Sequence, residues 1–133
     1  MIKQIAHICI NTSDLRETER FYGEALGLEK KFEFVRHDAP FGFYLDLGNG
    51  TFIEVFRGET APEGNIRHVA IQVEDLGGLV QRIRDCGYDV TDPKMGADHS
   101  WQAWVTDPNG VRIEFHEYTP ESRQLVGGVC EMN

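Results

Sequence analysis

Two similar stretches of sequence occur in this chain of 133 residues. The first copy reads His7-Ile-Cys-Ile-Asn-Thr-Ser-Asp14-Leu15, and the second reads His68-Val-Ala-Ile-Gln-Val-Glu-Asp75-Leu76. Further along, Asn49-Gly50-Thr-Phe-Ile-Glu54-Val-Phe aligns with Asn109-Gly110-Val-Arg-Ile-Glu114-Phe-His, with only one residue of difference in offset. A repeat of about 60 residues is too long for a solenoid unit, and two copies are too few for an array. The chain is therefore predicted to contain two copies of one supersecondary module.

Each copy is predicted to fold as βαβββ. It opens with an apolar, β-branched strand, at residues 5–11 and 68–73. Asp14 and Asp75 can cap the helices that follow, and Gly27 and Gly87 can end them. Three extended segments come next, at 31–35, 42–47 and 51–56 in the first copy and at 89–92, 101–106 and 111–118 in the second. Turns at 48–50 and 107–110 carry residues suited to positive φ.

These elements predict one α+β domain over residues 1–119. It consists of modules 1–57 and 66–119, a polar linker with Pro and Gly at 58–65, and a curved mixed sheet with helices on its outer face. Residues 120–133 have little periodicity and are predicted to be a C-terminal tail, whose order the sequence does not determine.

Composition excludes several kinds of partner. Lys and Arg number 13 against 22 Asp and Glu, so the formal charge is −9, which repels nucleic acid and anionic membrane surfaces. No segment approaches the roughly 18 apolar residues of a membrane helix, and the N-terminus has no signal-like apolar run. The three cysteines form neither an even disulfide framework nor a C-x-x-C pair. We expect a soluble cytoplasmic protein with no nucleic acid or membrane partner.

Four polar residues stand at equivalent positions in the two copies. Strand alternation places His7, His68, Glu54 and Glu114 on the face away from the helices, flanked by apolar neighbours that point the other way. An isolated strand histidine is more often an ordinary hydrogen-bonded residue than a ligand. Two carboxylates that share a concave site are costly without a cation, however, and the repeat makes the four a symmetric set. We therefore predict that they bind one metal ion.

Mixed imidazole and carboxylate ligands fit nickel, cobalt, zinc, iron or manganese better than calcium or magnesium. Nickel, cobalt and zinc are expected before iron and manganese. His116 follows Glu114 by two residues and so shares its face. It either orients a ligand or substrate or is a solvated strand-end histidine. His99, beside Asp98, is predicted to lie in a surface turn.

The motifs resemble those of the vicinal oxygen chelate superfamily, which has the glyoxalase/bleomycin resistance/dioxygenase fold. They are His7-x-x-Ile10, Asp14-Leu15, Phe21-Tyr22 and Leu26-Gly27-Leu28, then His68-x-x-Ile71, Asp75-Leu76 and Asp107-Pro108-Asn109-Gly110-Val-Arg-Ile-Glu114. The likeness covers about residues 3–118. Within the superfamily the pattern is most similar to glyoxalase I, lactoylglutathione lyase, whose metal ligands correspond to His7, Glu54, His68 and Glu114.

The resemblance implies a reaction. In glyoxalase I, the metal stabilises an enediolate while a carboxylate moves a proton between adjacent carbons of the methylglyoxal–glutathione hemithioacetal. By this likeness Glu114 is the main base and Glu54 its partner. Two departures put glutathione in question. Asn11 stands where the family pattern has an Arg that meets the glutathione carboxylate, and Gly58 stands where it has an Asn.

Other activities of the same superfamily remain as alternatives. An extradiol dioxygenase uses a His–His–Glu triad, which matches His7, His68 and Glu114, but Glu54 would occupy a position that dioxygen or catecholate needs. An epimerase uses similar proton chemistry. A binding protein of the bleomycin-resistance type usually lacks the ligands. Members pair their modules within a chain or between chains, and we expect a homodimer, since two short modules leave much sheet edge to cover.

Overall fold

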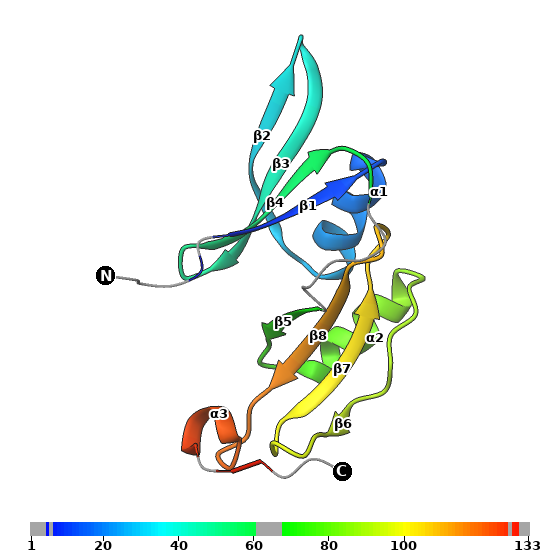
Figure 1. Cartoon of the computed structure of the whole chain (residues 1–133). Helices are drawn as coiled ribbons and strands as arrows, with labels where there is room; N and C mark the ends of the chain where they lie inside the picture. Colours follow the sequence, from blue (N-terminus) through cyan, green and yellow to red (C-terminus); the bar gives the residue numbers. More distant parts are fainter. Residues whose placement is uncertain (1–4, 6, 61–67, 128, 131–133) are drawn as a thin grey trace, which may run out of the picture. The chain divides into compact units, whose positions relative to one another are not determined.

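The computed structural model describes residues 5, 7–60, 68–127 and 129–130 (Figure 1). Its contacts divide the chain into two compact units. Unit 1 comprises Met1–Glu63 with Pro108–Gly110, and unit 2 comprises Gly64–Asp107 with Val111–Asn133. Most of the predicted linker 58–65 lies outside the described residues.

Unit 1 contains a four-stranded mixed sheet with helical turns on one face. Its elements are β1 (His7–Thr12), α1 (Leu15–Glu19), the π-helix η1 (Arg20–Ala25), β2 (Glu29–Arg36), β3 (Ala39–Gly48) and β4 (Thr51–Arg57). The strand order is β1-β4-β3-β2, with β1 parallel to β4 and the other pairs antiparallel. The first and last strands of the unit are thus parallel neighbours, and the helical segment follows the first strand in the chain, as the βαβββ prediction requires.

Unit 2 repeats this topology. Its elements are β5 (Val69–Gln72), α2 (Leu76–Asp85), β6 (Lys94–Met95), β7 (Trp101–Thr106) and β8 (Arg112–Glu117), followed by the short helix α3 (Arg123–Val126). The order β5-β8-β7-β6 has β5 parallel to β8, and it matches the order in unit 1. The predicted α+β class with two βαβββ modules is confirmed as two four-stranded mixed sheets.

Helix capping follows the predicted signals in both units. An Asp14 carboxylate oxygen accepts from the main-chain N–H of Glu17 at 3.0 Å, and Asp75 accepts from Gly78 at the same distance. Such caps satisfy amide groups that the first helical turn leaves unpaired. Gly27 and Gly87 have φ values of 76° and 88°, where glycine has no steric penalty.

The predicted strand at 89–92 is wrong. The edge strand of unit 2 is β6, which pairs Lys94 with Gln102 and Met95 with Trp101. Around Thr91 the pairing is irregular, because the Thr91 hydroxyl accepts from the main-chain N–H of Trp104 at 2.8 Å in place of a carbonyl. Pro93 follows and has no N–H to donate, so a regular ladder cannot run through this segment.

One face of each sheet forms the apolar core. In unit 1 the buried side chains include Ile10, Phe21, Leu45, Ile53 and Val55, and in unit 2 they include Leu76, Val80, Ile83, Ala103, Val105, Ile113 and Phe115. Burying each of the larger side chains contributes about 1.5–3 kcal/mol. The opposite faces carry the polar strand residues. Among the described residues, no helix is long and apolar enough to cross a membrane.

Candidate metal centre

In each unit, the face of the sheet opposite the apolar core is called the open face. In unit 1 it carries His7 and Glu54. On β1 the exposed positions are His7, Cys9 and Asn11, and the residues between them point into the core. Glu54 lies between two buried residues of β4 and projects to the same open face. The Nε2 atom of His7 lies 3.7 Å from Oε1 of Glu54. Alternation along the two strands therefore places this predicted pair as expected.

Two further side chains of unit 1 face Glu54. Cys9 and Tyr44 are its register partners on β1 and β3. A hydrogen bond to the Glu54 carboxylate, followed by desolvation and negative charge, raises the pKa of Tyr44. Desolvation comes first for Cys9, and the hydrogen bond to Glu54 and its charge also raise the pKa of this thiol. The Tyr44 hydroxyl also lies 3.2 Å from Nδ1 of His7, so it can orient the imidazole. Sequence reasoning missed Tyr44, because the β3–β4 register shifts between Asp46 and Gly48 and so does not follow from the turn alone.

Unit 2 has a tighter version of the same arrangement. The Nε2 atom of His68 lies 3.2 Å from Oε2 of Glu114, and Nε2 of His116 lies 2.8 Å from Oε1. Glu114 is 8% exposed, which is low for a glutamate on the face away from the core. Trp104 is its register partner on β7, and the Trp104 ring meets the His68 ring edge-on at 4.9 Å. Indole and imidazole rings thus desolvate this carboxylate.

These observations fit a divalent metal. The ion pairs that the described residues make with Glu54 and Glu114 come from histidines, with no Lys or Arg. A buried carboxylate that lacks a basic partner gains most from a cation. No cluster of three or more His, Cys, Asp or Glu side chains with metal-binding geometry occurs among the described residues. Unit 1 by itself brings His7 to Glu54, and unit 2 brings His68 and His116 to Glu114.

Asn11 and Gly58, where the chain departs from the glyoxalase I pattern, are neighbours. A Cβ atom built on Gly58 would lie 3.4 Å from Cγ and Oδ1 of Asn11. The main-chain N–H of Gly58 donates to the carbonyl of Thr12 at 2.9 Å, which holds the two strands together here. Asn11 thus presents a neutral amide where the glyoxalase I pattern has a cationic side chain.

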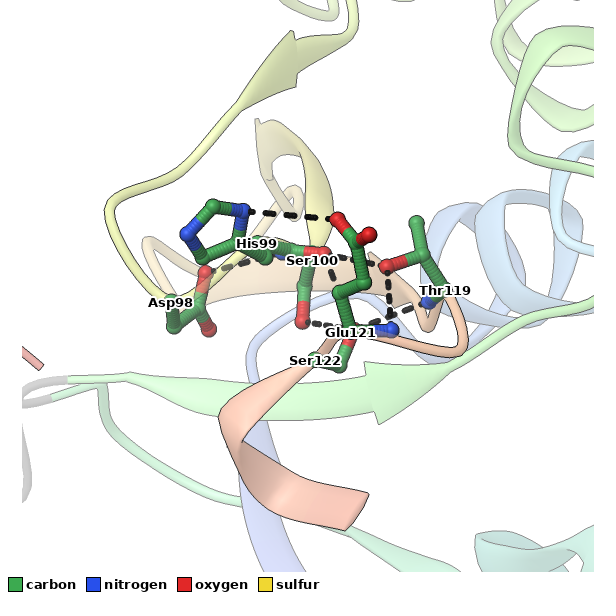
Figure 2. Close-up of polar contacts among 6 residues, drawn as sticks. All are labelled: Asp98, His99, Ser100, Thr119, Glu121 and Ser122. Atoms are coloured by element: carbon green, nitrogen blue, oxygen red, sulfur yellow. Dashed lines mark hydrogen bonds and ion pairs between the residues drawn. The ribbon is translucent and has the colours of Figure 1, made fainter. Parts of the chain in front are cut away.

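Figure 2 shows a second polar cluster, which contains His99. Its members are Asp98, His99, Ser100, Thr119, Glu121 and Ser122. The Thr119 and Ser122 hydroxyls donate to the His99 carbonyl at 2.7 and 3.0 Å, and the Ser100 hydroxyl donates to that of Ser122 at 2.8 Å. The His99 ring lies 4.0 Å from Glu121, and the Ser100 hydroxyl makes hydrogen bonds with Ser122 and Gln124. The predicted surface turn is confirmed, and the cluster attaches the segment that leads into α3 to the loop before β7.

A hollow of about 650 Å³ in unit 2 lies away from the histidine–glutamate pair. Its lining includes Tyr88, Val90, Trp104 and Arg112, but neither His68 nor Glu114. Arg112 is the one cationic side chain in this lining. Its guanidinium lies over the Trp104 ring, 4.5 Å from the ring centroid. The hollow therefore borders the open face without containing its ligands.

Fold and site together define a two-module α+β protein with His7 beside Glu54 in one module and with His68 and His116 beside Glu114 in the other. The chain belongs to the Glyoxalase/Bleomycin resistance protein/Dioxygenase superfamily, whose model matches residues 4–115. It is 31% identical to the uncharacterized protein YwkD of Bacillus subtilis (strain 168), over 88% of this chain and 98% of YwkD.

Solved structures agree with this assignment. A glyoxalase family protein from Enterococcus faecalis matches with a TM-score of 0.71 and 27% identity, over 86% of this chain and 98% of that one. A point mutant of the fosfomycin resistance protein FosX from Listeria monocytogenes, in complex with Mn(II) and dihydroxypropylphosphonic acid, matches with a TM-score of 0.73. Its identity is 19%, over 96% of this chain and 98% of that one, so this likeness concerns the fold.

Proposed function

We propose that this protein is a metal-dependent lyase or isomerase of the glyoxalase type, in which His7, Glu54, His68 and Glu114 bind one divalent transition ion. The observation that carries the proposal is that both units place a histidine and a glutamate side by side at equivalent positions on the open face. Desolvating a carboxylate costs free energy, so two such pairs at equivalent positions are not expected by chance. The donor set suits nickel, cobalt, zinc, iron or manganese, and the Mn(II) complex of FosX supports a divalent ion in this fold.

Glu114 is proposed as the main base. Its carboxylate is nearly buried between two imidazoles, where a proton taken from carbon is shielded from exchange with bulk water. The side chain of Glu54 is 15% exposed, against 10% for Glu114. We propose that Glu54 exchanges the proton on the side of the substrate opposite Glu114. When bound, a divalent ion would polarise two adjacent substrate oxygens and stabilise the negative charge that develops. Proton transfer between neighbouring carbons of a 2-oxoaldehyde adduct requires these two functions.

The thiol component of such an adduct is a separate question. A methylglyoxal–glutathione hemithioacetal carries carboxylates that a cationic side chain would bind. Asn11 supplies only an amide beside Gly58, so glutathione would need its charge matched elsewhere. We therefore propose a small 2-oxoaldehyde adduct as the substrate class and test glutathione against other thiols.

The four proposed ligands come from both modules. One ion bound by all four requires a module with His7 and Glu54 to pair with a module that carries His68 and Glu114. We propose that the pairing forms a homodimer whose sites are shared by two subunits, because each short module leaves sheet edges uncovered.

The decisive experiment is metal analysis followed by turnover. Purified full-length protein is analysed for bound metals, stripped, and reloaded separately with nickel, cobalt, zinc and manganese. Each form is assayed with methylglyoxal and glutathione, and with methylglyoxal and other low-molecular-weight thiols. We expect one ion per proposed site and thioester formation with at least one combination. Absence of turnover with all of them would refute the lyase proposal, and ring cleavage of a catechol by the iron form would favour the dioxygenase alternative.

A further inference from the structure

His116 is the third member of the unit 2 cluster, and it lacks a role in the function proposed above. Its Nε2 atom lies 2.8 Å from Oε1 of Glu114, and its side chain is only 12% exposed. Nε2 is buried and makes no hydrogen bond of acceptable geometry within the described part of the chain. Burying a polar ring nitrogen costs free energy unless the nitrogen has a polar partner, and the Glu114 carboxylate is the group at hand.

The repeat provides an internal comparison. Phe56 occupies in unit 1 the position that His116 occupies in unit 2, two residues after the glutamate on the same face. The Phe56 ring packs against Phe34 and Phe41 and cannot pair with a carboxylate, while the two oxygens of Glu114 face one imidazole each. The module that carries the proposed base thus has a second imidazole beside its glutamate, and it also has Ala70 and Trp104 where unit 1 has Cys9 and Tyr44. The difference points to a role specific to Glu114.

His116 also lies close to a second carboxylate. Desolvation is the largest influence on Asp98 and raises its pKa, but hydrogen bonds from Gln124 and from the Ser100 amide, with the nearby His116, together hold the pKa below its usual value. The Gln124 amide donates to Asp98 at 2.6 Å. Asp98 is thus held by α3 and the loop before β7, and it gives His116 a second negative neighbour besides Glu114.

We infer that His116 is a positioning residue for Glu114: it holds Oε1, so that Oε2 is directed toward His68 and the proposed metal. Glu114 then keeps one carboxylate rotamer, which lowers the reorganisation needed for proton transfer. This inference rests on the proposed function for the role of Glu114, but the contact itself can be measured in the metal-free protein. The His116–Glu114 contact is an ion-pair contact at 2.8 Å, and removing a polar partner behind a metal ligand typically changes metal affinity or activity by about 10–100-fold.

The first test is nuclear magnetic resonance of the histidine rings in metal-free, full-length protein. The ¹⁵N signals of His116 are assigned with the His116→Phe variant. Glu114→Gln is expected to shift the Nε2 signal of His116, and the matched change Glu54→Gln is expected to leave it in place. A His116 ring signal that does not respond to Glu114→Gln would overturn the inference, whether or not the protein is a lyase.

The second test measures the consequence for metal and catalysis. His116→Phe copies the residue of unit 1 and is expected to keep the fold and Tm. His116→Gln keeps an N–H donor that can reach Oε1. We expect His116→Phe to lower kcat or metal affinity by about 10–100-fold with KM changed less than about twofold, and His116→Gln to recover much of the loss. His37→Asn is the control, because His37 is exposed in a turn with φ of 51°, which asparagine tolerates.

The outcomes separate the two proposals. If the wild-type protein shows no turnover, the lyase proposal fails, and the ring shifts with calorimetric metal affinities still decide the role of His116. If turnover is present and His116→Phe equals wild type in kcat and in metal affinity, the positioning role is wrong while the lyase proposal stands.

Discussion

Replacing Glu114 by glutamine changes charge with little change in shape, which makes it a sharp test of the proposed base. The carboxylate offers one oxygen to His68 at 3.2 Å and the other to His116 at 2.8 Å. Glutamine keeps one oxygen and replaces the other with an NH₂ group that cannot accept a proton. A positioned general base contributes about 10²–10⁴ in rate, so we expect kcat to fall by that factor, equivalent to about 3–5 kcal/mol of barrier.

The assay compares kcat at saturating metal, with metal content measured on the same samples. Glu33→Gln, an exposed position on β2, is the control for the chemical change. Stability of the metal-free proteins should agree within about 1 kcal/mol, because glutamine preserves the volume at a site that is 8% exposed. Turnover within about tenfold of wild type at full metal occupancy would refute the assignment of Glu114 as base.

Three further outcomes are expected. Gly42→Ala should destabilise the protein by about 1–3 kcal/mol in urea unfolding, because its Cβ would overlap the main chain of β4, whereas Gly23→Ala, with its nearest contact at 3.9 Å, should not destabilise it. Mixing inactive His7→Ala and His68→Ala subunits should restore about a quarter of the sites if each site is shared by two chains, and no recovery of metal binding or turnover would place each site within one chain. The folded-state pKa of Asp98 lies below its unfolded value of 3.8, so the ionised carboxylate stabilises the fold above pH 3.8, and this stabilisation is lost as the pH falls through the folded-state pKa. Asp98→Asn should therefore weaken the acid dependence of the free energy of unfolding. An unchanged acid dependence in the variant would contradict this role of Asp98.

Much of the fold could be predicted from local sequence signals. The repeat specified two βαβββ modules, and the capping aspartates and positive-φ glycines marked the helix ends. These signals act over a few residues, so they do not depend on tertiary contacts. The exception is the segment before β6, where the side chain of Thr91 replaces a main-chain partner and Pro93 interrupts the ladder.

The candidate ligands were also accessible to sequence reasoning. Alternation along a strand is a local property with a period of two, so it placed His7, Glu54 and Glu114 on the open faces before any contact was known. What surrounds each carboxylate was not accessible in the same way. Tyr44 reaches Glu54 only because β3 pairs with β4 in one particular register.

The sequence by itself therefore determined the doubled module, the helix boundaries and the side of each sheet on which the two His–Glu pairs lie, because all three depend on short-range backbone geometry. Only the tertiary structure decided that Glu114 is nearly buried between His68 and His116 while Glu54 faces Tyr44 and Cys9. Burial and ion pairing depend on which strands become neighbours, and that pairing is set by cooperative packing of residues far apart in the chain.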